Sequence, residues 1–150
     1  MVAPTQVVLL VEDHTLIQNA LRDALIDAGY VVAVASDGGK AIRQLQAEAD
    51  RFGGVITDIG LGAGPDGWEV GHRAREFSPH IPVVYISGQR RGEWVAKGVT
   101  NSVMAPKPFA VAQIVAAISA LMVGEEARRG WPATQLEIAG ASRPRPRVSQ

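Results

Sequence analysis

The sequence contains no cysteine, which excludes disulfide bonds and metal sites built on thiolates. No apolar run approaches the length of a membrane span, and the N-terminus lacks the basic and apolar regions of a secretory signal. The formal net charge is zero, so composition gives no support for nucleic-acid binding or for electrostatic attachment to a membrane. We therefore expect a cytoplasmic protein with neither a membrane nor a nucleic acid as direct partner.

The composition that is present describes an ordinary globular protein, with 47% hydrophobic and 20% charged residues in a chain of 150. This length predicts one domain with a sizeable core. The apolar pattern fades near Val123, so we expect a folded domain over residues 5–123 and a C-terminal tail over residues 124–150 that contains Pro and Arg. The tail is too short for an independently folded DNA-binding module.

Short apolar runs alternate with helical patterns along the chain. Apolar residues at spacings of three and four predict the helices, with only weak helical character from Arg90 to Gly98. This alternation implies right-handed βαβ crossovers and a parallel sheet covered by helices on both faces. The strands are predicted at Val7–Val11, Val31–Ala35, Gly54–Thr57, Ile81–Ile86 and Ser102–Ala105.

Polar side chains stand at the ends of four of these runs. Glu12 and Asp13 follow the first run, Asp58 the third, Ser87 the fourth, and Lys107 comes shortly after the fifth. The C-termini of parallel strands share one edge of the sheet, which is where ligands bind. The sequence therefore predicts an acidic pocket with one cation beside it.

Each of these features has a plain structural alternative. The acidic pair could end a strand and cap a helix, and Asp58 could be a turn residue. Ser87-Gly88 is an ordinary turn pair, and Lys107 could be a solvated loop lysine. The three histidines are isolated from one another, which argues against a histidine metal site.

In combination and in this order, the residues resemble the receiver domain of two-component response regulators, over roughly residues 5–123. The resemblance rests on Glu12-Asp13, Asp58, Ser87-Gly88 and Lys107-Pro108-Phe109. It implies an α/β fold of the flavodoxin-like, doubly wound type, with five parallel strands in the order 2-1-3-4-5 and helices on both faces. With only a tail after the domain, the chain resembles the stand-alone type of receiver.

The resemblance implies that Asp58 accepts a phosphoryl group from a sensor histidine kinase or a histidine phosphotransfer protein. A carboxylate can act as a nucleophile toward phosphorus, and such a transfer depends on positioning and charge neutralisation. Lys107 would supply a positive charge and Ser87 a hydrogen bond to the phosphoryl group. Output would pass to an unidentified downstream protein or along a phosphorelay. The chain would not be an enzyme, apart from self-phosphorylation and autodephosphorylation.

The same resemblance implies Mg²⁺ as cofactor. Glu12, Asp13 and Asp58 would repel one another if left bare, and a hard divalent cation removes that repulsion. Asp13 and Asp58 would bind the ion directly, Glu12 would act through water, and the Gly60 carbonyl would be a backbone ligand. We also expect a cis peptide bond between Lys107 and Pro108, as the family's Lys-Pro pair usually has.

Two departures from the family pattern leave other functions open. The loop Ile59–Gly67 is longer and richer in glycine, which predicts greater mobility, and Met104 stands where the family usually has an aromatic switch residue. The chain could therefore be a pseudo-receiver that docks without being phosphorylated. A Mg²⁺-dependent phosphohydrolase is a weaker alternative, because Gly60 stands where such enzymes have an acid–base carboxylate.

Overall fold

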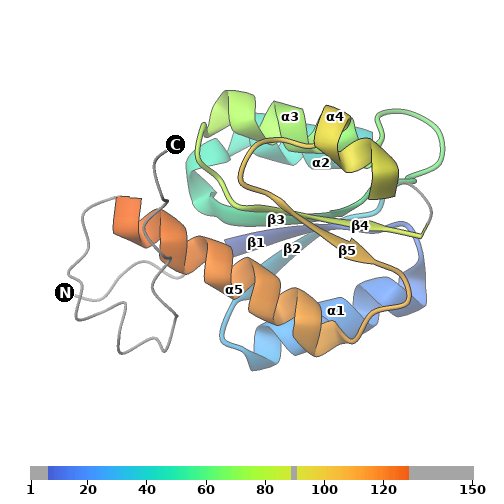
Figure 1. Ribbon diagram of the computed structural model, residues 1–150, viewed down its shortest axis with the longest axis horizontal. Coiled ribbons are helices and arrows are strands. Elements are labelled where there is room, and N and C mark those ends of the chain that lie inside the picture. Colours follow the sequence, from blue (N-terminus) through green and yellow to red (C-terminus); the bar gives the residue numbers. More distant parts are fainter. Residues whose placement is uncertain (1–6, 89–90, 129–150) are drawn as a thin grey trace, which may run out of the picture.

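The computed structural model describes residues 7–88 and 91–128, in which strands and helices alternate (Figure 1). The strands are β1 Val7–Val11, β2 Val31–Ala35, β3 Phe52–Asp58, β4 Val83–Ser87 and β5 Val103–Pro106. The helices are α1 Thr15–Asp27, α2 Gly38–Ala47, α3 Gly67–Phe77, α4 Trp94–Lys97 and α5 Val111–Arg128. Short 3-10 segments lie at Ala49–Arg51 and Arg91–Glu93.

The strands form one parallel sheet in the order β2-β1-β3-β4-β5, which confirms the predicted flavodoxin-like arrangement. Three strand boundaries were predicted wrongly. β3 runs from Phe52 to Asp58, so Asp58 belongs to the strand itself. β4 starts only at Val83, since Pro82 has no N–H to give to a strand ladder, and it continues to Ser87. β5 is shifted by one residue, to Val103–Pro106.

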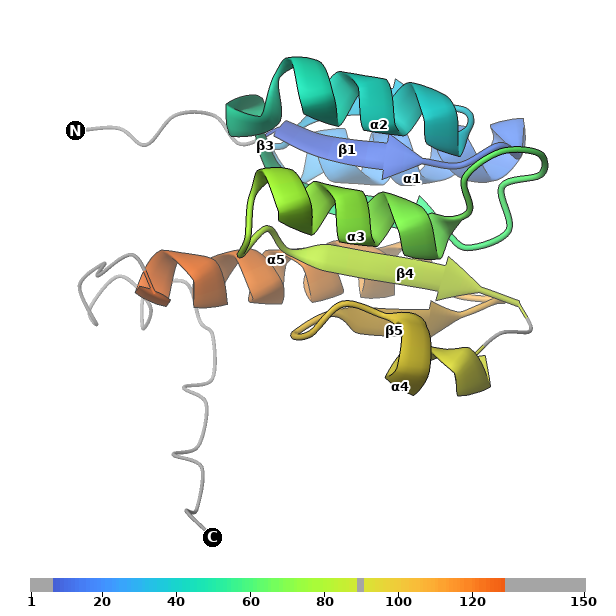
Figure 2. The same ribbon diagram turned by 90° about the horizontal axis from the view of Figure 1, so that it is seen from above.

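The helices cover both faces of the sheet. α1 and α5 lie on one face, and α2, α3 and α4 lie on the other (Figures 1 and 2). β1 shows how a strand buried on both faces serves two cores, because Leu9 packs toward α2 and α3 while Leu10 packs toward α1 and α5. This arrangement leaves the C-terminal edge of the strands as the place where the loops gather.

Local sequence signals account for several helix ends. Asp37 caps α2 by accepting a hydrogen bond from the Lys40 N–H at 2.8 Å. Asp66 does the same for α3, with the Glu69 N–H at 2.9 Å. Gly29 follows α1 with φ +100°, the left-handed conformation that glycine adopts without strain.

The segment between β4 and β5 has little helix, as predicted. α4 has four residues, and hydrogen bonds from side chains connect this segment to its neighbours. Trp94 Nε1 donates to Ser102 Oγ at 2.9 Å, and the Val99 N–H donates to the Tyr85 hydroxyl at 3.1 Å. The Lys97 carbonyl lies 2.7 Å from His72 Nε2 on α3.

The last helix runs past the expected domain end at Val123 and continues to Arg128. Residues from 129 onward lie outside the described part of the chain. Among the described residues, no helix combines the length and the apolar character needed to traverse a bilayer.

Candidate functional site

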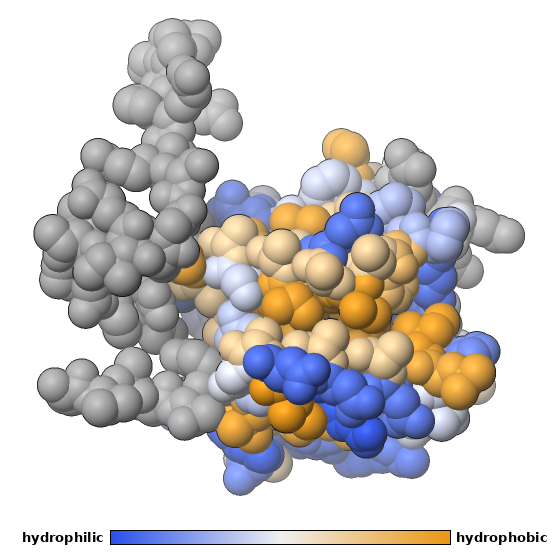
Figure 3. Space-filling view, turned by 90° about the horizontal axis from the view of Figure 1, so that it is seen from below, coloured by the Kyte–Doolittle hydropathy of each residue, from blue (hydrophilic) through white to orange (hydrophobic). Residues whose placement is uncertain are grey.

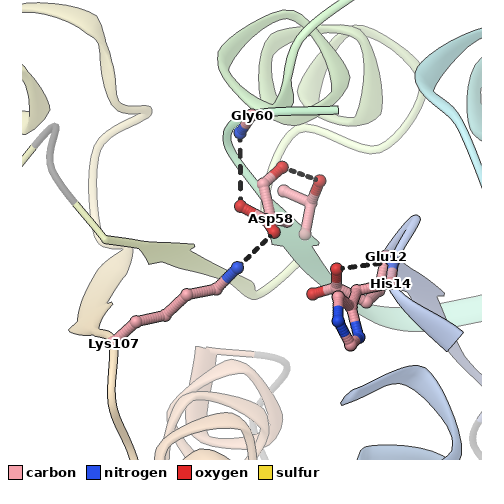
Figure 4. Close-up of polar contacts among 6 residues, drawn as sticks. Glu12, His14, Asp58, Gly60 and Lys107 are labelled. Atoms are coloured by element: carbon pink, nitrogen blue, oxygen red, sulfur yellow. Dashed lines mark hydrogen bonds and ion pairs between the residues drawn. The ribbon is translucent and has the colours of Figure 1, made fainter. Parts of the chain in front are cut away.

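Asp58 ends β3 and is almost completely buried, with 5% of its surface exposed. Lys107 Nζ donates to its Oδ2 at 2.6 Å, and the Gly60 N–H donates to its Oδ1 at 3.2 Å (Figure 4). The Asp58 carbonyl accepts a hydrogen bond from Thr57 Oγ1 at 2.8 Å. The carboxylate therefore has a defined orientation at the sheet edge, with a cation and a backbone donor against it.

The loop after Asp58 is packed at both ends. Gly67 opens α3 directly against the Asp58 carbonyl, where a Cβ atom would collide with the main chain. Leu61 is buried, and the Pro65 carbonyl lies against Gly38 at the start of α2, again where no Cβ would fit. These contacts hold the ends of the glycine-rich loop, whose greater mobility stays a prediction.

The acidic turn between β1 and α1 faces Asp58. Glu12 is fully buried, and its Oε2 accepts a hydrogen bond from the His14 N–H at 3.0 Å. Its Oε1 is buried without a hydrogen-bond partner. Asp13 is exposed, and one carboxylate oxygen from each of Glu12, Asp13 and Asp58 lies within 4.8 Å of the other two.

Burial and neighbouring charges perturb the ionisation of this cluster. Desolvation chiefly, together with the Asp58 charge, raises the pKa of Glu12 to about 7, against the lowering effects of the His14 N–H and Lys107. Burial by itself would lower the pKa of Lys107. The hydrogen bond with Asp58 and the charges of the carboxylates outweigh burial, so that its pKa is raised. The site is therefore an acidic pocket that favours a positive charge.

The donor set fits a hard divalent cation. Mg²⁺ prefers oxygen ligands and is usually held by one or two carboxylates together with water. The buried Oε1 of Glu12 has no partner in the protein, and a metal-bound water would satisfy it. The carboxylates of Asp13 and Asp58 supply the remaining charge.

Ser87, the last residue of β4, lies beside Lys107, the first residue after β5. Ser87 is buried at the end of β4, and its carbonyl accepts a hydrogen bond from the Lys107 N–H at 2.9 Å. The peptide bond between Lys107 and Pro108 is cis, which confirms the prediction. All six residues singled out in the sequence therefore stand at one edge of the sheet, with the Gly60 N–H already in contact with Asp58.

Met104 lies on β5 opposite Tyr85 of β4, and it packs against the core beneath α2 and α3. Tyr85 is fully buried, with its ring centroid 4.8 Å from that of Trp68. Position 104 therefore carries no aromatic side chain, but the aromatic side chain of Tyr85 lies beside it on the adjacent strand.

One contact at the site was missed in the sequence. Gln18 of α1 donates from its side-chain Nε2 to the Glu12 carbonyl at 2.8 Å. A glutamine on a helix carries no motif, so only the orientation of α1 against the acidic turn reveals it.

Comparison with known proteins shows a match to the family model of the response regulator receiver domain over residues 8–119. A solved receiver protein from Sinorhizobium medicae is 41% identical, with a TM-score of 0.76 over 79% of this chain and 94% of that chain. The receiver domain of the sensor histidine kinase PA1611 from Pseudomonas aeruginosa is 26% identical, with a TM-score of 0.66 over 79% and 98%. That structure has a magnesium ion coordinated in its active-site cleft.

Curated relatives include the transcriptional activator IrlR of Burkholderia pseudomallei, 29% identical over 88% of this chain and 56% of the relative. The regulatory protein TrcR of Mycobacterium tuberculosis is 31% identical over 77% of this chain and 44% of the relative. The chain thus spans about half the length of these curated relatives.

Proposed function

This chain belongs to the response regulator receiver domain family, and from that premise we propose that it is a signalling switch phosphorylated on Asp58. One observation carries the assignment to that residue. The buried Asp58 carboxylate stands 2.6 Å from the Lys107 ammonium and within 4.8 Å of two further carboxylates. A nucleophile, a cation and a set of metal ligands are therefore assembled at one point.

The proposed transfer is a displacement at phosphorus. A carboxylate oxygen of Asp58 forms a bond to phosphorus, while the bond from phosphorus to the donor's imidazole nitrogen breaks and its electron pair stays on the imidazole. Lys107 is close enough to neutralise a phosphoryl oxygen, and Ser87 would donate its hydroxyl hydrogen to another. Bound Mg²⁺ supplies the positive charge that offsets repulsion between the carboxylates and the incoming group.

We propose that Mg²⁺ is held by Asp13 and Asp58, with Glu12 acting through water and the Gly60 carbonyl as a backbone ligand. The all-oxygen donor set and the unpaired Glu12 Oε1 support this assignment. Asp13→Asn should weaken Mg²⁺ binding measured by isothermal titration calorimetry. Wild-type affinity in that variant would show that the ion binds elsewhere.

The proposed donor is a sensor histidine kinase or a histidine phosphotransfer protein. An apolar groove of about 540 Å³ adjoins the site between α1 and the start of α5, and Lys107 lines it as well. Leu16 at its edge is 74% exposed, and Figure 3 shows apolar residues gathered on this face of the molecule. The remaining lining residues are Ile17, Ala20, Pro108, Phe109 and Val111.

This groove suits a helix that carries the phosphohistidine, because an amphipathic helix binds by laying its apolar face into such a groove. Leu16→Glu should slow transfer from a panel of autophosphorylated histidine kinases and leave labelling by acetyl phosphate unchanged. Equal loss with both kinds of donor would assign Leu16 to folding instead of docking.

Intact-mass spectrometry after incubation with Mg²⁺ and acetyl phosphate tests the function as a whole. Wild-type protein should gain one hydroxylamine-labile phosphoryl group, and Asp58→Asn should gain none. Mg²⁺ binding without labelling of the wild type would point to the pseudo-receiver alternative. A receiver unit over residues 5–123, a cytoplasmic location and output through an unidentified downstream protein belong to the same proposal.

A further inference from the structure

Glu12 forms hydrogen bonds through both its main chain and its side chain. Its N–H donates to the Ala35 carbonyl on β2 at 3.1 Å. Its carboxylate Oε2 accepts from the His14 N–H at 3.0 Å. These bonds leave two oxygen atoms of Glu12 to account for, the main-chain carbonyl and the buried Oε1.

The main-chain carbonyl of Glu12 is taken by Gln18. The side-chain Nε2 of Gln18 reaches back from the first turns of α1 and donates to this oxygen at 2.8 Å. The main-chain N–H of the same residue donates to the His14 carbonyl at 2.9 Å. One glutamine thus holds the Glu12–Asp13 and His14–Thr15 peptide groups, between the end of β1 and the start of α1.

The hydrogen bond from Gln18 to the Glu12 carbonyl affects the residues proposed to hold the metal ion. The Glu12 carbonyl belongs to the peptide group that joins Glu12 to Asp13, so its direction helps to set where both carboxylates point. Mg²⁺ tolerates little deviation from octahedral geometry, which makes its affinity sensitive to such directions. Groups that hydrogen-bond to metal ligands and orient them, without contacting the ion, commonly contribute tenfold or more to metal affinity.

We propose that Gln18 is a positioning residue for the Mg²⁺ site, fixing the Glu12–Asp13 peptide group so that both side chains face Asp58. The inference rests on the proposed function, and it adds a role in metal affinity for a residue that contacts neither the ion nor the phosphoryl group. Removal of the hydrogen bond from Gln18 to the Glu12 carbonyl should raise the Mg²⁺ concentration needed for half-maximal phosphorylation. It should leave the rate of phosphorylation at saturating Mg²⁺ unchanged.

The test variant is Gln18→Met, which keeps the length of the side chain and removes the donor. A matched control is Gln44→Met, because Gln44 Nε2 donates in the same way from α2 to the Val34 carbonyl at 3.2 Å. Both variants lose one hydrogen bond from a helix side chain to a carbonyl of the sheet region. Only Gln18 lies at the acidic turn.

Isothermal titration calorimetry with Mg²⁺ should show binding about tenfold weaker in Gln18→Met and unchanged in Gln44→Met. Urea unfolding in EDTA should show similar stabilities for the two variants. If Gln18→Met does not fold, Gln18→Asn serves instead, because it keeps the amide on a side chain one methylene shorter.

The outcomes separate the two proposals. Wild-type Mg²⁺ affinity in a folded Gln18 variant would overturn the positioning role and leave the proposed function intact. Equal weakening in the Gln18 and Gln44 variants would also overturn it, because the effect would then be a general loss of stability. Failure of the wild type to bind Mg²⁺ or accept a phosphoryl group would instead overturn the proposed function.

Discussion

Glu12→Gln should change how the stability of the metal-free protein depends on pH. Glu12 is fully buried and its carboxylate Oε1 has no partner, so its ionised form is costly without a cation. Burial chiefly, together with the Asp58 charge, raises its pKa from 4.5 to about 7. One pKa unit corresponds to about 1.4 kcal/mol, so this difference corresponds to about 3 kcal/mol of unfolding free energy.

The sign follows from which state holds the proton. Between the ordinary pKa of Glu12 and its raised value, the folded protein keeps a proton that the unfolded chain has released. The folded state then binds more protons, so the free energy of unfolding falls as pH rises. The contribution is complete below pH 4.5, decreases through the interval, and is lost above about pH 7.

Urea unfolding in EDTA at a series of pH values measures this pH dependence of the unfolding free energy. The wild type should lose about 3 kcal/mol relative to Glu12→Gln between acid and mildly alkaline pH, because the amide does not titrate. Glu48→Gln is a suitable control, since the side chain of Glu48 is 58% exposed and its ion pair with Arg51 lies at the surface. Parallel pH profiles for wild type and Glu12→Gln would refute the reasoning. Added Mg²⁺ should stabilise the wild type most at the higher pH values.

Gly71→Ala should destabilise the fold, since its Cβ would lie 2.9 Å from Cζ of the buried Tyr85 and closer still to the hydroxyl oxygen. Overpacking costs about 1–3 kcal/mol and outweighs the better helix propensity, whereas Gly124→Ala has open space around it and should be mildly stabilising in thermal unfolding. Beryllofluoride with Mg²⁺ should change hydrogen exchange more in residues 87–109 than in residues 14–50, because the proposed contacts of Lys107 and Ser87 with the phosphoryl group lie there. Equal changes in both regions would rule out that output surface.

The edge of the sheet could be predicted from the sequence because strand periodicity and strand ends are local signals. A run such as Val7–Val11 is recognisable by itself, and the polar residue after it is then placed by the rule for parallel sheets. Strand ends were less predictable. The start of β4 depends on the missing N–H of Pro82, and the end of β3 depends on pairing of Asp58 with Ile86.

Contacts that depend on the orientation of a whole helix could not be predicted. The hydrogen bond from Gln18 to the Glu12 carbonyl requires α1 to leave the acidic turn in one direction, which no residue type encodes. The packing of the Pro65 carbonyl against Gly38 joins the glycine-rich loop to the start of α2, which is far from it in the sequence. The continuity of α5 through to Arg128 also has no signal in the sequence, because the apolar pattern fades before the helix ends.

The central claim is that Asp58 itself carries the phosphoryl group, and chemical mapping tests this most directly. Borohydride reduction after labelling with acetyl phosphate and Mg²⁺ converts a phosphorylated aspartate to homoserine, which peptide mass spectrometry locates. The account predicts homoserine at position 58 and at no other carboxylate, and none when EDTA replaces Mg²⁺. Homoserine at position 13, the corresponding alcohol 2-amino-5-hydroxypentanoic acid at position 12, or labelling that persists in Asp58→Asn would contradict it.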